Sequence, residues 1–94
     1  MVTAFVMIQT RRDSINETAE ALTKLDGVAE VYSVAGEWDL VAVIRVATNE
    51  QMAEVVTNQM LKMEGITRTS TAIAFRTYSR FDLDRMFSIG FEKG

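Results

Sequence analysis

Apolar residues follow two different periodicities along the chain. In four runs they alternate with polar residues or fill both alternating sets, which is typical of β-strands. These runs cover residues 2–9, 28–35, 40–47 and 66–78. Between them, residues 14–25 and 49–63 place apolar side chains three and four positions apart, which predicts two amphipathic helices. The pattern therefore predicts the order strand–helix–strand–strand–helix–strand.

The two halves of this pattern resemble each other in sequence. Lys24-Leu25-Asp26-Gly27-Val28 recurs as Lys62-Met63-Glu64-Gly65-Ile66, and each copy joins the end of a predicted helix to a strand. Two βαβ units in one short chain are typical of a ferredoxin-like fold, whereas two copies are too few for a solenoid core. We therefore predict an α+β, ferredoxin-like βαββαβ sandwich, in which two helices lie on one face of a four-stranded antiparallel sheet.

Local sequence predicts how both helices begin and end. Ser14 with Glu17, and Thr48 with Gln51, have the spacing of a capping box, in which side chains bond the free backbone N–H groups of the first turn. Gly27 follows the first helix, where a left-handed residue ends many helices. Gly65 holds the matching place after the second helix.

The sheet should leave one apolar face uncovered. The strands at residues 2–9 and 40–47 carry apolar side chains on both faces. Right-handed βαβ crossovers, however, put both helices on the same side of a sheet. A free apolar face of this size marks an interaction surface. We therefore predict a homodimer that packs its sheets face to face, as in a dimeric α+β barrel.

Composition narrows the chemistry. The chain contains no cysteine and no histidine, which removes disulfides, thiolate and imidazole catalysis, and most zinc and haem sites, so we expect no metal and no cofactor. The net charge is −3 and the basic residues are scattered, so direct binding of nucleic acid is not expected. No signal peptide and no apolar run of about 20 residues is present, which predicts no membrane span and a cytoplasmic location.

The length predicts one domain over residues 1–94, with residues 79–94 as a C-terminal extension. Two conformations are open for this extension. Ser79 and Asp82 have the spacing to cap a short helix that carries Leu83, Met86 and Phe87. Alternatively, the segment is an extended tail that reaches a neighbouring subunit.

The candidate binding residues lie in two segments. Between the second and third strands, Gly36, Glu37, Trp38, Asp39 and Leu40 form either a structural hairpin turn or a site for a small zwitterion. In the second interpretation, exposed turn amides hold a carboxylate and Asp39 pairs with an ammonium group. The second segment opens the last strand and carries Thr67, Thr69 and Thr71, which β-propensity alone also explains.

These motifs resemble the effector-binding (RAM) domain of Lrp/AsnC-type transcriptional regulators. That family shows a Gly-x-aromatic-Asp turn after the second strand, here Gly36 to Asp39, and a Gly-Val…Thr-x-Thr stretch entering the fourth, here Gly65 to Thr71. The resemblance covers residues 2–78. It implies a ferredoxin-like fold, sheet-to-sheet dimers, and rings that often contain four dimers.

The resemblance also implies that amino acids bind in clefts where the dimers meet. By position it assigns this role to Gly36, Trp38, Asp39, Thr69 and Thr71, with Glu37 and Leu40 beside them. Family members usually carry a helix-turn-helix before this domain, and the chain begins directly at the first strand. We therefore expect a stand-alone form that senses an amino acid or joins full-length Lrp/AsnC regulators. Trp38 stands where a smaller aromatic residue is common, which leaves the ligand open.

Two other functions fit a ferredoxin-like fold. A small dimeric α+β-barrel enzyme, such as a cofactor-free monooxygenase or an isomerase, would use a cavity lined by Tyr32, Tyr78, Trp38 or Asp39. A regulatory domain of the ACT type would also bind amino acids, but such domains commonly associate side by side. The apolar second face argues against that arrangement.

Overall fold

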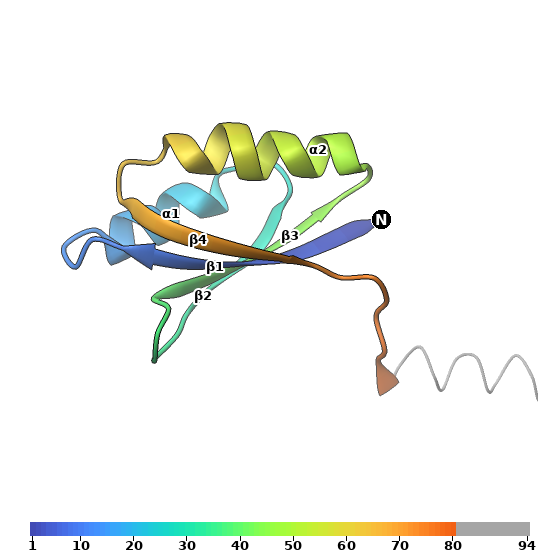
Figure 1. The fold of residues 1–94 in the computed structure, drawn as a ribbon, viewed down its shortest axis with the longest axis horizontal. Coiled ribbons are helices and arrows are strands. Elements are labelled where there is room, and N and C mark those ends of the chain that lie inside the picture. Colours follow the sequence, from blue (N-terminus) through green and yellow to red (C-terminus); the bar gives the residue numbers. More distant parts are fainter. Residues whose placement is uncertain (81–94) are drawn as a thin grey trace, which may run out of the picture.

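The computed structural model describes residues 1–80 and shows one sheet covered by helices on one side (Figure 1). The four strands pair antiparallel in the order β2-β3-β1-β4. The strands are β1 (Val2–Thr10), β2 (Val28–Ser33), β3 (Leu40–Val46) and β4 (Ile66–Ile73). The helices are α1 (Ile15–Thr23) and α2 (Asn49–Ala53), and α2 continues through the π-helical segment η1 (Glu54–Gln59) and the 3-10 turn η2 (Met60–Lys62). The predicted ferredoxin-like fold is confirmed.

The core lies between the helices and the covered face of the sheet. Alternation along β1 and β3 turns every second side chain toward the helices, which contribute apolar side chains from α1, α2, η1 and η2. The buried cluster consists of Ala4, Val6, Ile8, Leu22, Leu40, Ala42, Ile44, Met52, Val55 and Met60. Burial of each larger side chain contributes about 1.5–3 kcal/mol. This cluster is therefore the main source of the domain's stability.

The two predicted capping boxes differ in outcome. At α2 the box is complete, because the Thr48 hydroxyl accepts from the Gln51 N–H and the Gln51 side chain accepts from the Thr48 N–H. At α1 it is wrong, because Ser14 has a φ of −119° and a ψ of 7° rather than the extended backbone of an N-cap. Its hydroxyl donates to the Asp13 carboxylate instead. The helix is also shorter than predicted and ends at Thr23.

The last strand ends at Ile73, short of the predicted limit at Tyr78. The final ladder contact is the bond from the Ala74 N–H to the Thr3 carbonyl, at 2.9 Å. β1 extends one residue past this contact, to Val2, so β4 leaves the sheet before β1 ends, at a bend in the chain at Phe75. Most of the predicted C-terminal helix falls on residues 81–94, outside the described residues. Within residues 1–80, no helix is long and apolar enough to cross a membrane.

The repeated glycines have different structural roles. Gly27 has a φ of +95°, as expected for a left-handed residue, although α1 already ends at Thr23. Gly65 has no positive φ. A Cβ atom there would lie 2.3 Å from the Thr18 hydroxyl oxygen, so the loop between η2 and β4 packs directly on α1. The sequence repeat is therefore real in topology but not in local backbone conformation.

Candidate functional site

The turn between β2 and β3 is built around Gly36. This residue has a φ of +114°, which residues other than glycine rarely adopt. Nothing lies within 4 Å of the position that a Cβ atom would take. Below the turn, the Val34 N–H donates to the Asp39 carbonyl at 3.0 Å. Gly36 and Glu37 are exposed, whereas Trp38 and Asp39 are partly buried. The turn therefore projects beyond the sheet on a fixed base.

Asp39 fastens this turn to the end of β1. Its carboxylate oxygen Oδ2 accepts from the Thr10 N–H at 2.9 Å, and its own N–H donates to the Ile8 carbonyl at 2.9 Å. A carboxylate that accepts a backbone N–H makes a charge-assisted bond. This geometry supports the structural interpretation of Asp39, since the side chain holds the backbone of a neighbouring strand.

A cluster of four side chains lies beside the turn, and we call it the Trp38 cluster: Gln9, Glu37, Trp38 and Arg68. The Arg68 guanidinium lies 4.9 Å from the centre of the Trp38 ring and 3.7 Å from the Glu37 carboxylate. Gln9 donates from Nε2 to the Glu37 carbonyl at 2.7 Å. The cluster thus combines an aromatic ring with one positively charged and one negatively charged group.

Arg68 and Gln9 were not among the main predicted site residues. Arg68 lies on β4 and Gln9 on β1, and the two residues are paired in the β1–β4 ladder. Arg68 belongs to the Thr-rich stretch, but alternation alone turns it away from the threonines around it. Only the pairing of β1 with β4 brings it to Trp38, so the strand register was the missing information.

The structure divides the predicted residues between the two sides of the sheet. Thr69 and Thr71 pair with Ile8 and Val6, whose side chains are in the core, so both threonines face the helix side. Thr71 lines an apolar groove of about 240 Å³ between α2 and β4. The Leu40 side chain is fully buried. Gly36, Glu37, Trp38 and Asp39 are brought together, whereas Thr69 and Thr71 lie apart from them.

The face of the sheet opposite the helices, here called the open face, carries Phe5, Met7, Val41 and Val43 on β1 and β3. Phe5 is 41% exposed although it lies mid-strand. Val43 is buried between its ladder neighbours Phe5 and Glu30. In the described domain, large apolar side chains therefore meet solvent on this face.

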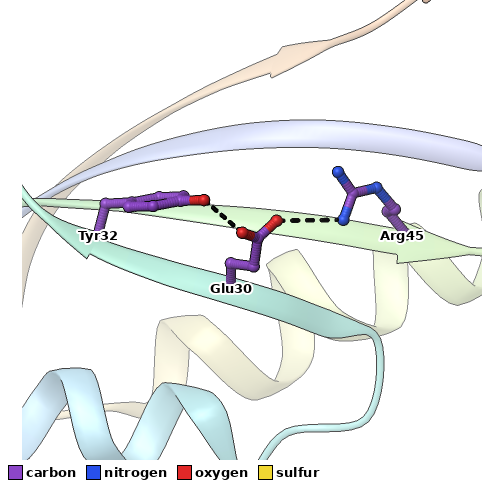
Figure 2. Close-up of polar contacts among 3 residues, drawn as sticks. All are labelled: Glu30, Tyr32 and Arg45. Atoms are coloured by element: carbon purple, nitrogen blue, oxygen red, sulfur yellow. Dashed lines mark hydrogen bonds and ion pairs between the residues drawn. The ribbon is translucent and has the colours of Figure 1, made fainter. Parts of the chain in front are cut away.

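A polar group borders the open face (Figure 2). The Tyr32 hydroxyl donates to one oxygen of the Glu30 carboxylate, and the Arg45 guanidinium lies 3.3 Å from the other. The bond from Tyr32, and then the interactions with Arg45, lower the pKa of Glu30. The same bond raises the pKa of Tyr32, because ionisation would remove its donor beside a carboxylate. The three side chains thus form a pre-arranged polar group on β2 and β3.

The enzyme alternative requires a cavity lined by tyrosine or by a buried carboxylate. Tyr32 and Tyr78 instead lie 49% and 76% exposed. Among residues 1–80, no group of three or more acidic side chains is placed to hold a metal ion. The geometry brings together charged and aromatic surface groups, which is an arrangement suited to binding.

Comparison with known proteins places this geometry in context. The sequence model of the Lrp/AsnC ligand binding domain matches residues 3–83. An HTH-type transcriptional regulator from Pyrococcus furiosus is 38% identical over 78 residues, which cover 80% of this chain and 52% of that protein. The chain therefore spans about half the length of the curated relatives it matches.

Solved structures agree with the sequence comparison. A crystal structure of a protein from Thermus thermophilus is 48% identical, with a TM-score of 0.80 over 85% of this chain and 100% of that one. A transcriptional regulator from Neisseria meningitidis, solved as a complex with L-Met, is 16% identical, with a TM-score of 0.75 over 84% of this chain and 53% of that one. At this identity, the likeness supports the fold alone. The chain belongs to the Lrp/AsnC ligand-binding domain family.

Proposed function

We propose that this domain binds a small effector, an amino acid, and self-associates, and that through these two properties it serves transcriptional regulation rather than catalysis. Family membership and relatives that are HTH-type transcriptional regulators support the regulatory role. Because the match covers half of such a relative, the proposal concerns the regulatory half. A regulator of this kind responds when its ligand favours one assembly over another.

The observation that carries the ligand proposal is the Trp38 cluster. Glu37 and Arg68 are 66% and 60% exposed and 3.7 Å apart, so their ion pair contributes little to stability. An amino acid carries the same two charges in complementary order. Its carboxylate would pair with the Arg68 guanidinium and its ammonium with Glu37, while its side chain would lie against Trp38. The loose pair is thereby exchanged for two pairs with the ligand.

The remaining site residues have supporting roles in this proposal. Gly36 allows the turn, and Asp39 fixes it to β1 so that Trp38 is held in place. Thr69 and Thr71 lie on the helix side of the edge strand β4. They would reach a ligand only where another copy completes the site, as expected for a cleft between dimers.

Self-association is proposed through the open face, as a homodimer that assembles further into rings. Phe5 and Met7 meet solvent there, and a second copy of the same face would cover them. The polar group of Glu30, Tyr32 and Arg45 borders the same surface and would fix how the two sheets align.

Isothermal titration of the protein against each proteinogenic amino acid tests the ligand proposal. Binding at submillimolar concentration is expected for at least one of them, and Arg68→Ala should abolish it. Arg12→Ala, which removes an exposed arginine from the loop before α1, is the matched control and should leave binding unchanged. If no amino acid binds, or if both variants bind equally well, the Trp38 cluster is not the site.

Sedimentation velocity tests assembly, with and without the amino acid that titration identifies. We expect a dimer or a multiple of it at micromolar concentration, and a change in the size distribution when ligand is added. A monomer under all conditions would contradict the proposed dimer.

A further inference from the structure

The ring of Trp38 already holds a cation, which comes from the domain itself. The Arg68 guanidinium carbon lies 4.9 Å from the ring centre, within the distance of about 6 Å at which the face of an aromatic ring attracts a positive charge. The same guanidinium lies 3.7 Å from the Glu37 carboxylate. The ring and the carboxylate together therefore form a place for one cation.

This place is fixed by the backbone on both sides of Trp38. The Gln9 side-chain amide donates to the Glu37 carbonyl at 2.7 Å, and the Asp39 carboxylate accepts from the Thr10 N–H at 2.9 Å. The Trp38 side chain is itself partly buried. The ring and its neighbouring carboxylate are therefore arranged before any ligand binds.

The cation in this place is held more loosely. The Arg68 side chain is 60% exposed, and its ion pair with Glu37 is of the solvent-exposed kind that contributes little to stability. A cation–π contact at an exposed site is also weak. A ligand that offers the ring a cation of its own can therefore replace Arg68 at small cost.

The charges around Trp38 do not balance. Glu37 and Asp39 flank it in the sequence and each carry a carboxylate, whereas Arg68 is the cationic member of the cluster. Arg11, which follows β1, lines a separate groove beside α1. An amino acid with an uncharged side chain is a zwitterion and leaves this excess of negative charge unchanged. An amino acid with a cationic side chain removes it.

The proposed binding mode also leaves the ring without its cation. In that mode Arg68 pairs with the ligand's carboxylate and Glu37 with its ammonium group, so the guanidinium turns away from Trp38. An aliphatic ligand side chain would cover the ring face but would not restore the attraction between a cation and the ring. A guanidinium or ammonium group at the end of the ligand side chain would restore it.

We propose that the ligand of the Trp38 cluster is a basic amino acid, whose side-chain cation replaces Arg68 over the Trp38 ring. This inference rests on the proposed function, because it names the class of amino acid that the same site binds. Arg68 occupies the ring face until the ligand arrives and then pairs with the ligand's carboxylate. A planar guanidinium stacks on an aromatic ring better than an ammonium group does, so arginine should bind more tightly than lysine.

Calorimetric titration with arginine and with citrulline tests the ligand class. The two molecules have the same backbone groups and nearly the same shape, but the side chain of citrulline is uncharged. Arginine should bind at least about tenfold more tightly than citrulline. The ratio of the two dissociation constants should fall at least about threefold in Trp38→Leu, and most of it should remain in Trp38→Phe, which keeps an aromatic face. Circular dichroism confirms that both variants are folded.

Agmatine, which is arginine without its carboxylate, tests the replacement of Arg68. In the unchanged protein agmatine competes with Arg68 for the ring and gains no contact from the displaced guanidinium. Arg68→Ala should therefore strengthen agmatine binding by about threefold or more, although the same substitution abolishes arginine binding. Arg12→Ala, at an exposed position of the loop before α1, should change neither.

The outcomes separate this inference from the proposed function. Equal binding of arginine and citrulline, or a loss of agmatine binding in Arg68→Ala, would overturn the basic ligand. If a neutral amino acid binds more tightly than arginine and requires Arg68, the proposed function holds and the basic ligand is wrong. If none of the proteinogenic amino acids binds, both are wrong.

Discussion

The two faces of the sheet use similar side chains under very different conditions. Along β1, Val6 and Ile8 are fully buried under the helices, while Phe5, which lies between two buried residues of the same strand, is 41% exposed on the open face. One face is completed within a single chain, and the other carries apolar side chains that no described part of the chain covers. The pattern of apolar residues thus indicates a strand whose two faces should both be covered. It does not indicate whether the covering residues come from the same chain.

The faces also differ in their polar residues. The covered face is filled by aliphatic side chains, whereas the open face is bordered by Glu30, Tyr32 and Arg45 in one connected group. An aliphatic core tolerates several packings, but a charged group must be matched. We expect the covered face to determine stability and the open face to determine how the partner aligns.

The largest effect should come from truncating the covered face. Ile8→Ala removes a fully buried side chain and should lower the free energy of unfolding by about 2–5 kcal/mol. Met7→Ala, one position away on the open face, should change the stability of the monomer by less than about 1 kcal/mol. Urea denaturation at concentrations where the protein is monomeric measures both. Equal losses would mean that the two faces do not differ in this way.

The open face should respond instead to an added charge. Phe5→Asp would bury an unpaired carboxylate between two packed sheets, so the dimer dissociation constant should rise by about a hundredfold or more. Phe5→Leu, which keeps the surface apolar, should change it much less. Sedimentation equilibrium gives both constants, and an unchanged constant for Phe5→Asp would place the interface elsewhere.

A smaller effect should come from the way α2 is fixed over the covered face. Thr48→Ala removes one half of a complete capping box and should cost about 0.5–2 kcal/mol. Ser14→Ala should change stability by less than about 0.5 kcal/mol, because the Ser14 hydroxyl does not cap α1. Thermal unfolding of the two variants measures this difference, which should vanish if Ser14 caps its helix in solution.

The smallest effect should be the pH dependence of the polar group on the open face. The bond from Tyr32 and the interactions with Arg45 lower the pKa of Glu30. The contribution of the Glu30 carboxylate to stability is therefore present above the ordinary glutamate pKa of about 4.3 and is lost as pH falls through the lowered value. The pKa of Tyr32 is raised, so its contribution is present below the ordinary tyrosine pKa of about 10 and is lost as pH rises through the raised value.

Between these limits, stability should not depend on the titration of this group. Glu30→Gln should therefore flatten the acidic limb of a plot of melting temperature against pH, by a small amount because the side chains are exposed. Glu20→Gln, on the exposed side of α1, is the control. An acidic limb that stays as steep in Glu30→Gln as in the control would show that the group does not contribute in solution.

Most of the fold was predictable because it follows from periodicity and from one repeat. The recurrence of Lys24–Val28 at Lys62–Ile66 predicted both βαβ units, and the Thr48 cap follows from side chains close together in the sequence. The errors arose where distant residues decide. Ser14 has the composition of a cap but not its backbone angles, and β4 ends at Ile73 because the chain bends at Phe75, although β1 extends to Val2 beside it.

The candidate site was predictable only in its local part. Gly36 indicates its turn through its own conformational freedom, and its φ of +114° agrees. That Arg68 lies over Trp38 depends on the register of β4 against β1, which no local pattern specifies. The same register turns Thr69 and Thr71 to the other side of the sheet, which residue chemistry alone did not reveal.

The strand order has a consequence for how this chain can be divided. Within the first βαβ unit, β1 and β2 are not neighbours, because β3 of the second unit lies between them, and β1 likewise separates β3 from β4. Each half of the chain, taken alone, therefore contains no hydrogen-bonded strand pair, although each half contains a complete sequence repeat. A single repeat would have to take its neighbouring strands from another molecule to form this sheet.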